Sequence, residues 1–237
     1  VSHVSNALGT INPIEEITQK AHAVGAKILI DGAQAASHIT LDMQKLDADF
    51  YCFSAHKMFG PTGVGVLYGK EEMLNELPPY QGGGEMIKEV SFEKTTYACL
   101  PHKFEAGTPN IAGVIAFKAA IDFINDLEID QIAKYEEELL QYATTEILKI
   151  EGVKIYGTAK HKSGIISFNI NSLHPYDIGM IVDKMGVAIR TGHHCTQPIM
   201  KRFNIPGTAR ISIAVYNTKA EIDTCINAIK KAKQMLS

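Results

Sequence analysis

The chain has 237 residues, of which 46% are hydrophobic, so it is long enough and apolar enough to bury a core. Its formal net charge is only −3, and lysine and arginine are scattered among aspartate and glutamate. This argues against a nucleic-acid or membrane-surface protein, which needs a concentrated basic face. No apolar run is long enough to cross a bilayer and no signal peptide is recognisable, so we expect neither nucleic acid nor a membrane as a partner.

The start of the chain and the cysteines give two further expectations. The chain does not begin with Met, and residues 1–6 are typical of the last part of a buried strand. We therefore expect that an N-terminal portion of the protein precedes them. The four cysteines lie far apart without CxxC spacing, which predicts neither a metal site nor a disulfide framework and favours a reduced, cytoplasmic setting.

The first part of the chain alternates short apolar strands with helical segments. A helix is expected from Asn12, which can act as its cap, and Pro13, which suits the first helical position, to Gly25. Strands are expected at residues 27–31, 49–54 and 64–68. Such alternation predicts βαβ units and a parallel sheet, in which ligands bind beyond the carboxyl ends of the strands.

The second part of the chain follows an irregular segment. Residues 78–103 contain several Pro and Gly breakers, and we expect a lid, a binding loop or a subunit contact there. Helices are expected at 110–127 and 130–150, and strands at 153–156, 164–170, 187–190 and 210–215. A last helix starts at the capping box Thr218-x-x-Glu221. We expect residues 1–127 to be part of a large domain and residues 128–237 to form a small one.

Lys57 is the first candidate for chemistry. It lies in Ser54-x-His56-Lys57, directly after a strand, and the turn Gly60-Pro61-Thr62-Gly63 follows. An ammonium at the end of a buried strand needs a partner or a function, and one function is an imine with a carbonyl cofactor. A lone lysine in this place is more often a surface residue, and the glycines alone are weak signs of phosphate binding.

Asp31 makes the cofactor interpretation stronger. It ends the preceding apolar strand, and Gln34 follows it closely. A pyridoxal ring needs a carboxylate against its pyridine nitrogen, which keeps the ring protonated and able to take up electrons. Alone, an aspartate after a strand is more often a turn or a helix cap. Together, Asp31, Gln34, Ser54, His56 and Lys57 predict a ring-nitrogen partner, a donor to the ring oxygen, phosphate donors and an imine-forming amine.

Three motifs carry a family resemblance: Asp31-Gly-Ala-Gln34, Ser54-Ala-His56-Lys57 and Arg190-Thr-Gly-His-His-Cys195. They resemble the aminotransferase class-V proteins of fold type I, and among these the SufS-like (group II) cysteine desulfurases, the branch that includes selenocysteine lyases. The resemblance implies an α/β fold composed of the C-terminal half of a large parallel or mixed-sheet domain and a small α+β C-terminal domain. It implies pyridoxal 5′-phosphate as the cofactor.

The resemblance also implies roles for individual residues. Lys57 holds the cofactor and later moves a proton at the substrate α-carbon, Asp31 pairs with the ring nitrogen and Gln34 approaches the ring hydroxyl. Ser54 and His56 contact the phosphate. The remaining implied residues bind cofactor or substrate: Thr108 on the phosphate of the other subunit of a homodimer, Asn6 near cofactor and substrate, and Arg210 on the substrate carboxylate. A structural arginine paired with an acid is the alternative for Arg210.

Cys195 decides the reaction that the resemblance implies. It follows a polar, basic turn after a strand, a setting that favours a thiolate, whereas most buried cysteines are small apolar residues. In the family this cysteine takes sulfur from L-cysteine, becomes a persulfide and releases L-alanine. A sulfur-acceptor protein in iron–sulfur cluster assembly is the implied partner. Thr196-Gln197 follows the cysteine, where the family pattern has a small residue, and this departure concerns the choice of acceptor more than the chemistry.

Two alternatives remain open from the sequence. One is a selenocysteine lyase or another class-V activity, because the cofactor residues do not separate these reactions. The other is an inactive fragment that serves in assembly, because an aromatic residue against the cofactor ring and part of the phosphate site are expected upstream of Val1 in this family.

Overall fold

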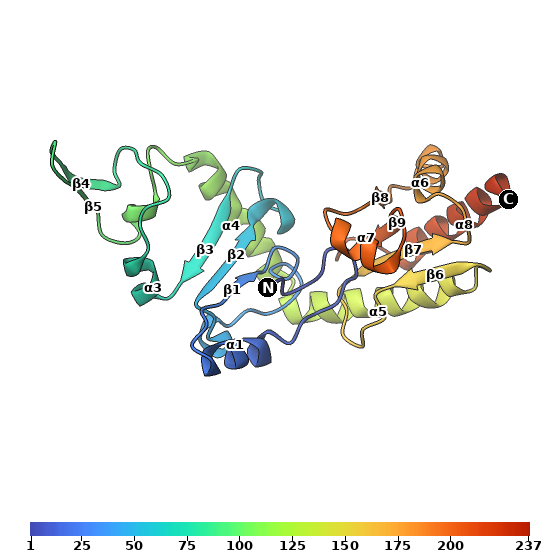
Figure 1. Ribbon diagram of the computed structural model, residues 1–237. Helices are drawn as coiled ribbons and strands as arrows, with labels where there is room; N and C mark the ends of the chain where they lie inside the picture. Colours follow the sequence, from blue (N-terminus) through green and yellow to red (C-terminus); the bar gives the residue numbers. More distant parts are fainter. The chain divides into compact units, whose positions relative to one another are not determined.

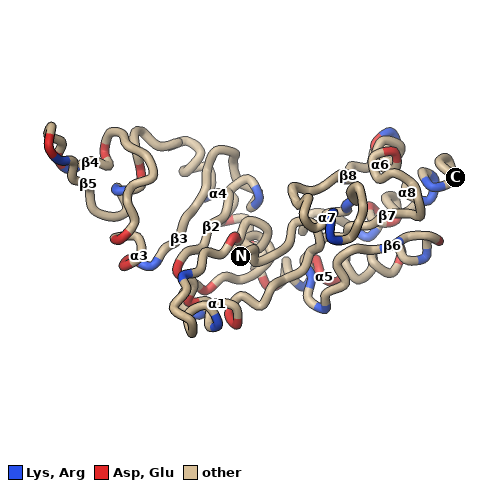
Figure 2. The backbone as a smooth tube through the Cα atoms, in the orientation of Figure 1, with Lys and Arg blue, Asp and Glu red and all other residues tan.

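The computed structural model describes all residues 1–237 and divides them into two compact units (Figure 1). Unit 1 contains Val1–His3 and Pro13–Leu127, and unit 2 contains Val4–Asn12 and Glu128–Ser237. None of the helices is both long and apolar enough to cross a membrane. Along the backbone, lysine and arginine are interspersed with aspartate and glutamate in both units (Figure 2).

Unit 1 is built around a three-stranded sheet. Its helices are α1 (Ile14–Ala23), α2 (Met43–Leu46), α3 (Glu71–Glu76) and α4 (Ile111–Asp126), with short 3-10 turns η1 (Ala55–Lys57) and η2 (His102–Phe104). Its strands are β1 (Leu29–Asp31), β2 (Phe50–Ser54), β3 (Gly65–Gly69), β4 (Ile87–Val90) and β5 (Thr95–Tyr97).

The sheet of unit 1 has the order β1-β2-β3. β1 and β2 are parallel, as the alternation of strands and helices predicts, but β3 runs antiparallel to β2. The predicted parallel pairing is thus present between β1 and β2, and the sheet as a whole is mixed, which agrees with the parallel or mixed sheet that the resemblance implies. The reason for the reversal of β3 is the connection, because only the turn after Lys57 joins β2 to β3, whereas a parallel crossover needs a dozen or more residues, usually a helix.

The core of unit 1 lies on one face of this sheet. Tyr51 and Phe53 point to the same side of β2, since alternate residues of a strand share a face. Toward the start of β2, α1 packs through Ile14 against Ile30 and Tyr51, and toward its end α4 packs through Phe117 against Phe53. The helices thereby hold the strand ends from which the candidate residues extend.

Three local expectations in the first part of the chain are corrected. Residues 1–6 form only isolated bridges, Ser2 with Asp31 and Val4 with Ile11, and not a strand. Helix α1 begins at Ile14 and has Pro13 at its N-cap position without a side-chain cap, so Asn12 is not the cap. Residues 78–103 are not irregular throughout, because β4 and β5 form an antiparallel hairpin that projects from unit 1 (Figure 1).

Unit 2 is a four-stranded antiparallel sheet with helices. The strands are β6 (Val153–Tyr156), β7 (Ile165–Ile170), β8 (Arg190–Gly192) and β9 (Thr208–Ser212), in the order β6-β7-β9-β8. The helices are α5 (Ile129–Leu148), α6 (Pro175–Lys184), α7 (Gln197–Phe203) and α8 (Lys219–Leu236). Strands β8 and β9 differ from the predicted ranges 187–190 and 210–215. Their backbone ladder runs from Arg190 opposite Arg210 to Gly192 opposite Thr208, so β8 extends beyond residue 190 and β9 begins before residue 210.

Both faces of the unit 2 sheet are covered, and all six residues of β7 are buried. Ile166, Phe168 and Ile170 point to one face and belong to the apolar core shared with α5, α6 and α8. The opposite face is more polar and lies under residues 4–12, where Ser167 donates a hydrogen bond of 2.5 Å to the carbonyl oxygen of Ala7. Arg210 of β9 pairs with Ser167 and lies on this polar face.

Candidate active site

Asp31 and Ser54 end two neighbouring parallel strands, so both lie at the same edge of the unit 1 sheet. Asp31 is exposed, and its Oδ1 accepts a hydrogen bond of 2.9 Å from the backbone N–H of Ala33. Gln34 follows in the turn beyond β1, where the backbone N–H of Gly32 donates to the carbonyl oxygen of Cys52 at 2.8 Å. The structure thus brings Asp31, Gln34 and Ser54 to one edge.

Lys57 is the last residue of the short turn η1 that begins directly after β2. The turn is closed by backbone hydrogen bonds from Ala55 to Val64, at 3.0 Å, and from Gly60 to Ala55, at 2.9 Å. The side chains of Lys57 and His56 are exposed and form no hydrogen bond or ion pair. A free amine and a free imidazole therefore extend from a hydrogen-bonded turn that follows directly after Ser54.

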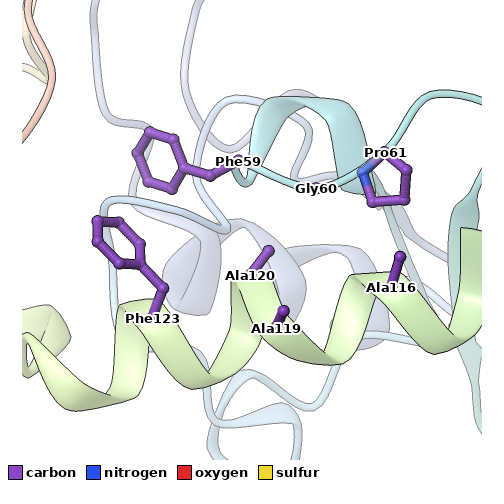
Figure 3. A pocket seen from close by; sticks show the side chains of 7 residues that line it. All are labelled: Phe59, Gly60, Pro61, Ala116, Ala119, Ala120 and Phe123. Atoms are coloured by element: carbon purple, nitrogen blue, oxygen red, sulfur yellow. The ribbon is translucent and has the colours of Figure 1, made fainter.

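An apolar pocket separates the turn after Lys57 from α4 (Figure 3). The rings of Phe59 and Phe123 face one another edge to face, with 5.6 Å between their centroids. A Cβ on Gly60 would lie 2.7 Å from the Phe117 ring, so only glycine allows this close approach. The lining has no charged group, and we therefore interpret the pocket as support for the turn and not as a place for a polar ligand.

Thr108 lies exposed just before α4, outside the turn that carries Lys57. The next polar residue, Asn110, caps α4 by accepting a hydrogen bond of 3.0 Å from the backbone N–H of Gly113. Its amide also donates to the carbonyl oxygen of Gly63 at 3.5 Å. The start of α4 is thereby joined to the Gly60–Gly63 turn, and Thr108 belongs to the same part of unit 1 as Lys57.

Cys195 lies in the loop between β8 and α7 in unit 2, and its side chain is exposed. An Nη2 of Arg190 lies 3.8 Å from its Sγ. The loop therefore offers a reachable sulfur atom next to a positive charge.

Arg210 lies half-buried on β9, and no carboxylate pairs with it. Its Nη1 donates a hydrogen bond of 2.8 Å to the carbonyl oxygen of Asn6, and its Nε has no partner. Burial first, and then the nearby Arg190, lower the pKa of Arg210. The structure thus does not support the alternative of a structural arginine paired with an acid, and leaves a guanidinium able to bind an anion.

The four cysteines differ in their suitability as nucleophiles. Burial raises the pKa of the Cys225 thiol to about 11, and burial together with Asp31 raises that of Cys52, so both are protonated thiols at neutral pH. Cys99 is exposed, but no basic side chain contacts its sulfur. Cys195 is exposed and has Arg190 beside it, so it is the best nucleophile of the four.

His194 and Asn6 form a connection that sequence reasoning missed. Asn6 Nδ2 donates a hydrogen bond of 2.6 Å to the carbonyl oxygen of His194, although the two residues are 188 positions apart. His194 itself is buried, whereas His193 is exposed. A run of two histidines shows no periodicity that could separate the buried one from the exposed one, so only the tertiary structure assigns them.

Comparison with protein families gives one match that covers nearly the whole chain. The model of the family described as aminotransferase class-V matches residues 1–225. The chain belongs to the aminotransferase class-V family. The family predicted from the three motifs around Lys57, Asp31 and Cys195 is thus confirmed.

Individual relatives of this class-V chain are named cysteine desulfurases. A cysteine desulfurase of Serratia proteamaculans is 47% identical over 237 residues, which are 100% of this chain and 58% of the relative. Solved structures of cysteine desulfurases from Escherichia coli and Thermococcus onnurineus are similar, each with a TM-score of 0.95. They are 38% and 39% identical to this chain, which they cover completely, while it covers 59% and 60% of theirs.

These similarities confirm the predicted fold class. The class-V chain has the α/β architecture of a fold-type I protein, with the mixed sheet of unit 1 and the smaller antiparallel sheet of unit 2. It spans only 58% of the length of the Serratia relative.

Proposed function

We propose that this chain is part of a pyridoxal-phosphate-dependent cysteine desulfurase, which converts L-cysteine into L-alanine and leaves a persulfide on Cys195. The observation that carries the proposal is the free Lys57 amine at the sheet edge that also carries Asp31, in a chain whose relatives are named cysteine desulfurases. Residues 1–127 would form part of the large cofactor-binding domain and residues 128–237 the small domain.

The donor set of unit 1 fits pyridoxal phosphate. Asp31 supplies a carboxylate for the ring nitrogen, and Gln34 an amide for the ring oxygen. Lys57 supplies an amine for the aldehyde, and Ser54 and His56 supply donors for the phosphate, with side chains that have no partner within the chain. When bound, the cofactor provides an electron sink for a negative charge at the substrate α-carbon.

Each protein group has a defined task in this proposal. Arg210 binds the substrate carboxylate through its planar fork, and Asn6, whose carbonyl oxygen accepts from Arg210, holds that side chain toward its ligand. Lys57 takes the proton from the substrate α-carbon and returns a proton as alanine forms. Asp31 keeps the ring nitrogen protonated. Thr108 is proposed to contact the phosphate bound by the second subunit of a homodimer.

Cys195 carries the sulfur. Its thiolate attacks the sulfur atom of the substrate, a sulfur–sulfur bond forms as the substrate carbon–sulfur bond breaks, and the electron pair of the broken bond stays with the carbon that becomes the alanine methyl group. The reaction converts L-cysteine and a thiol into L-alanine and a persulfide, with no external oxidant. Because Cys195 is exposed, we propose that a sulfur-acceptor protein of iron–sulfur cluster assembly takes the sulfur from it. Four free thiols support a reducing, cytoplasmic compartment.

Cofactor attachment is tested with the 237-residue chain and added pyridoxal phosphate. We expect a visible absorption band that persists after dialysis, and borohydride reduction should fix the cofactor on the peptide that contains Lys57. Lys57→Ala should abolish both signals, because no other amine extends from that turn. Lys94→Ala changes an exposed lysine of the β4–β5 hairpin and should leave both signals unchanged. No band in the unmodified chain, or a label on another lysine, would contradict the assignment.

Desulfuration is tested by measuring alanine and sulfide formed from L-cysteine under dithiothreitol. Cys195→Ser should lower the rate by a factor on the order of a hundred or more, because a hydroxyl is a far weaker nucleophile toward sulfur. Cys99→Ser removes the other exposed cysteine and should leave the rate unchanged. Full activity in Cys195→Ser would show that Cys195 does not accept the sulfur.

A further inference from the structure

The backbone of the Cys195 loop has an unusual conformation. His194 and Cys195 have φ angles of 53° and 60°, so two consecutive residues that are not glycine lie in the left-handed region. Residues with a Cβ adopt this region rarely, and a pair of them persists only where surrounding contacts hold it. The contacts that hold this loop therefore also determine where the Cys195 sulfur lies.

The His194 side chain provides the first of these contacts. It is 2% exposed, and its Nε2 lies 3.1 Å from the carbonyl oxygen and 2.8 Å from the Oγ1 of Thr208 on β9. A carbonyl oxygen only accepts, so Nε2 carries the proton and donates it, while Nδ1 has no partner. Burial first, and then the charge of Arg210, lower the pKa of His194 to about 4. At neutral pH the ring is therefore an uncharged donor, unsuited to exchanging protons with substrate.

The His194 main chain provides the second contact. Its carbonyl oxygen accepts the 2.6 Å hydrogen bond from Asn6, and the carbonyl oxygen of Asn6 accepts from Arg210. The loop is thus fixed from two sides, by β9 through the side chain and by the 4–12 segment through the backbone. The second contact joins the loop to the arginine that binds the substrate carboxylate in the proposed function.

We propose that His194 is a positioning residue, which holds the left-handed loop so that the Cys195 sulfur stays beside Arg190. The importance of this placement for sulfur transfer rests on the proposed function, but the placement itself is a property of the free thiol. It can be measured without cofactor or substrate, so its failure is distinguishable from failure of the proposed function.

The test is a double-mutant cycle on the reactivity of the Cys195 thiol. The rate constant for alkylation by iodoacetamide is measured at neutral pH by mass spectrometry of the peptide that contains Cys195. Cys99, exposed in unit 1, serves as the internal reference. With the native loop, Arg190→Gln should lower the rate constant roughly threefold to tenfold, because it removes the positive charge beside the Cys195 sulfur.

His194→Leu replaces the imidazole by an apolar side chain of similar size and removes the hydrogen-bond donor to Thr208. In the His194→Leu background Arg190→Gln should change the rate constant by less than about twofold, since the Cys195 sulfur is then no longer held beside Arg190. His194→Gln restores a donor that can reach Thr208 and should restore the sensitivity to Arg190. His193→Leu, the same change at the exposed neighbour, should keep the full sensitivity.

Loss of fold in His194→Leu would also abolish the effect of Arg190→Gln, so the comparison is made only among variants whose circular dichroism spectrum matches that of the unmodified chain. An equal effect of Arg190→Gln in the native background and in the His194→Leu background would overturn the proposal. If His194→Leu does not fold, Asn6→Ala is substituted for it, because it removes the donor to the His194 carbonyl oxygen. Undiminished sensitivity to Arg190 in Asn6→Ala would likewise count against the proposal.

Discussion

At the residue scale, the position of Asp31 depends on the glycine that follows it. A Cβ on Gly32 would lie 2.0 Å from the Tyr51 ring, which is fully buried and hydrogen-bonded through its hydroxyl to His3 at 3.0 Å. Neither partner can move away without opening the core. The glycine of the Asp31-Gly-Ala-Gln34 motif is thus required by packing, and it allows the chain to turn back over β2 directly after Asp31.

Gly32→Ala should therefore destabilise the protein by about 1–3 kcal/mol, the usual cost of forcing an extra methyl group into a packed core. The measurement is the midpoint of urea unfolding followed by circular dichroism. Gly82→Ala is the matched control, because a Cβ there meets no atom within 4 Å and should change stability by no more than about 0.5 kcal/mol. An unchanged midpoint in Gly32→Ala would show that Tyr51 gives way easily.

At the element scale, the helices that the sequence predicts agree with the structure better than the predicted strand arrangement does. α4 and α5 lie within two residues of the predicted ranges, and the capping box of α8 is present, with Glu221 N–H donating to Thr218 Oγ1 at 3.2 Å. These features depend on neighbours within one turn of helix, which the sequence contains. The reversal of β3 and the β4–β5 hairpin depend on pairing between separate strands, and these were missed.

The candidate site follows the same division. Asp31, Ser54, His56 and Lys57 were predicted because they end adjacent strands, a property visible in the sequence. The contact of Asn6 with His194, and that of Arg210 with Asn6, join segments that are far apart in the chain. No periodicity or local motif indicates such contacts. For the candidate residues of unit 2, the resemblance therefore supplied the residues and the structure supplied their geometry.

At the scale of the whole molecule, two buried histidines make stability depend on pH. Burial lowers the pKa of His3 in unit 1, and that of His194 in unit 2 falls to about 4 from an ordinary value of 6.5. Between the folded pKa of His194, about 4, and the ordinary value of 6.5, the unfolded chain binds a proton at this residue that the folded chain does not bind. The free energy of unfolding therefore decreases as the pH falls below 6.5, and the loss from His194 is complete near its folded pKa.

We expect His194 alone to account for a loss of up to about 3 kcal/mol between pH 6.5 and pH 4. The measurement is the free energy of urea unfolding as a function of pH. His194→Gln cannot titrate, so its curve should be flatter over this range, with the remaining slope due in part to His3. His193→Gln, at an exposed position, should keep the slope of the unmodified chain. An equally steep curve in His194→Gln would contradict the prediction.

The sequence by itself determined the family, the α/β fold class, the helices α1, α4, α5 and α8 and the strand-end residues around Lys57, because all of these depend on local patterns and short motifs. Only the tertiary structure decided which of two adjacent histidines is buried and which segment anchors the Cys195 loop. It also decided that Arg210 has no acidic partner. The physical reason is that burial and long-range hydrogen bonds are set by which distant segments pack together, and that is a property of the folded chain.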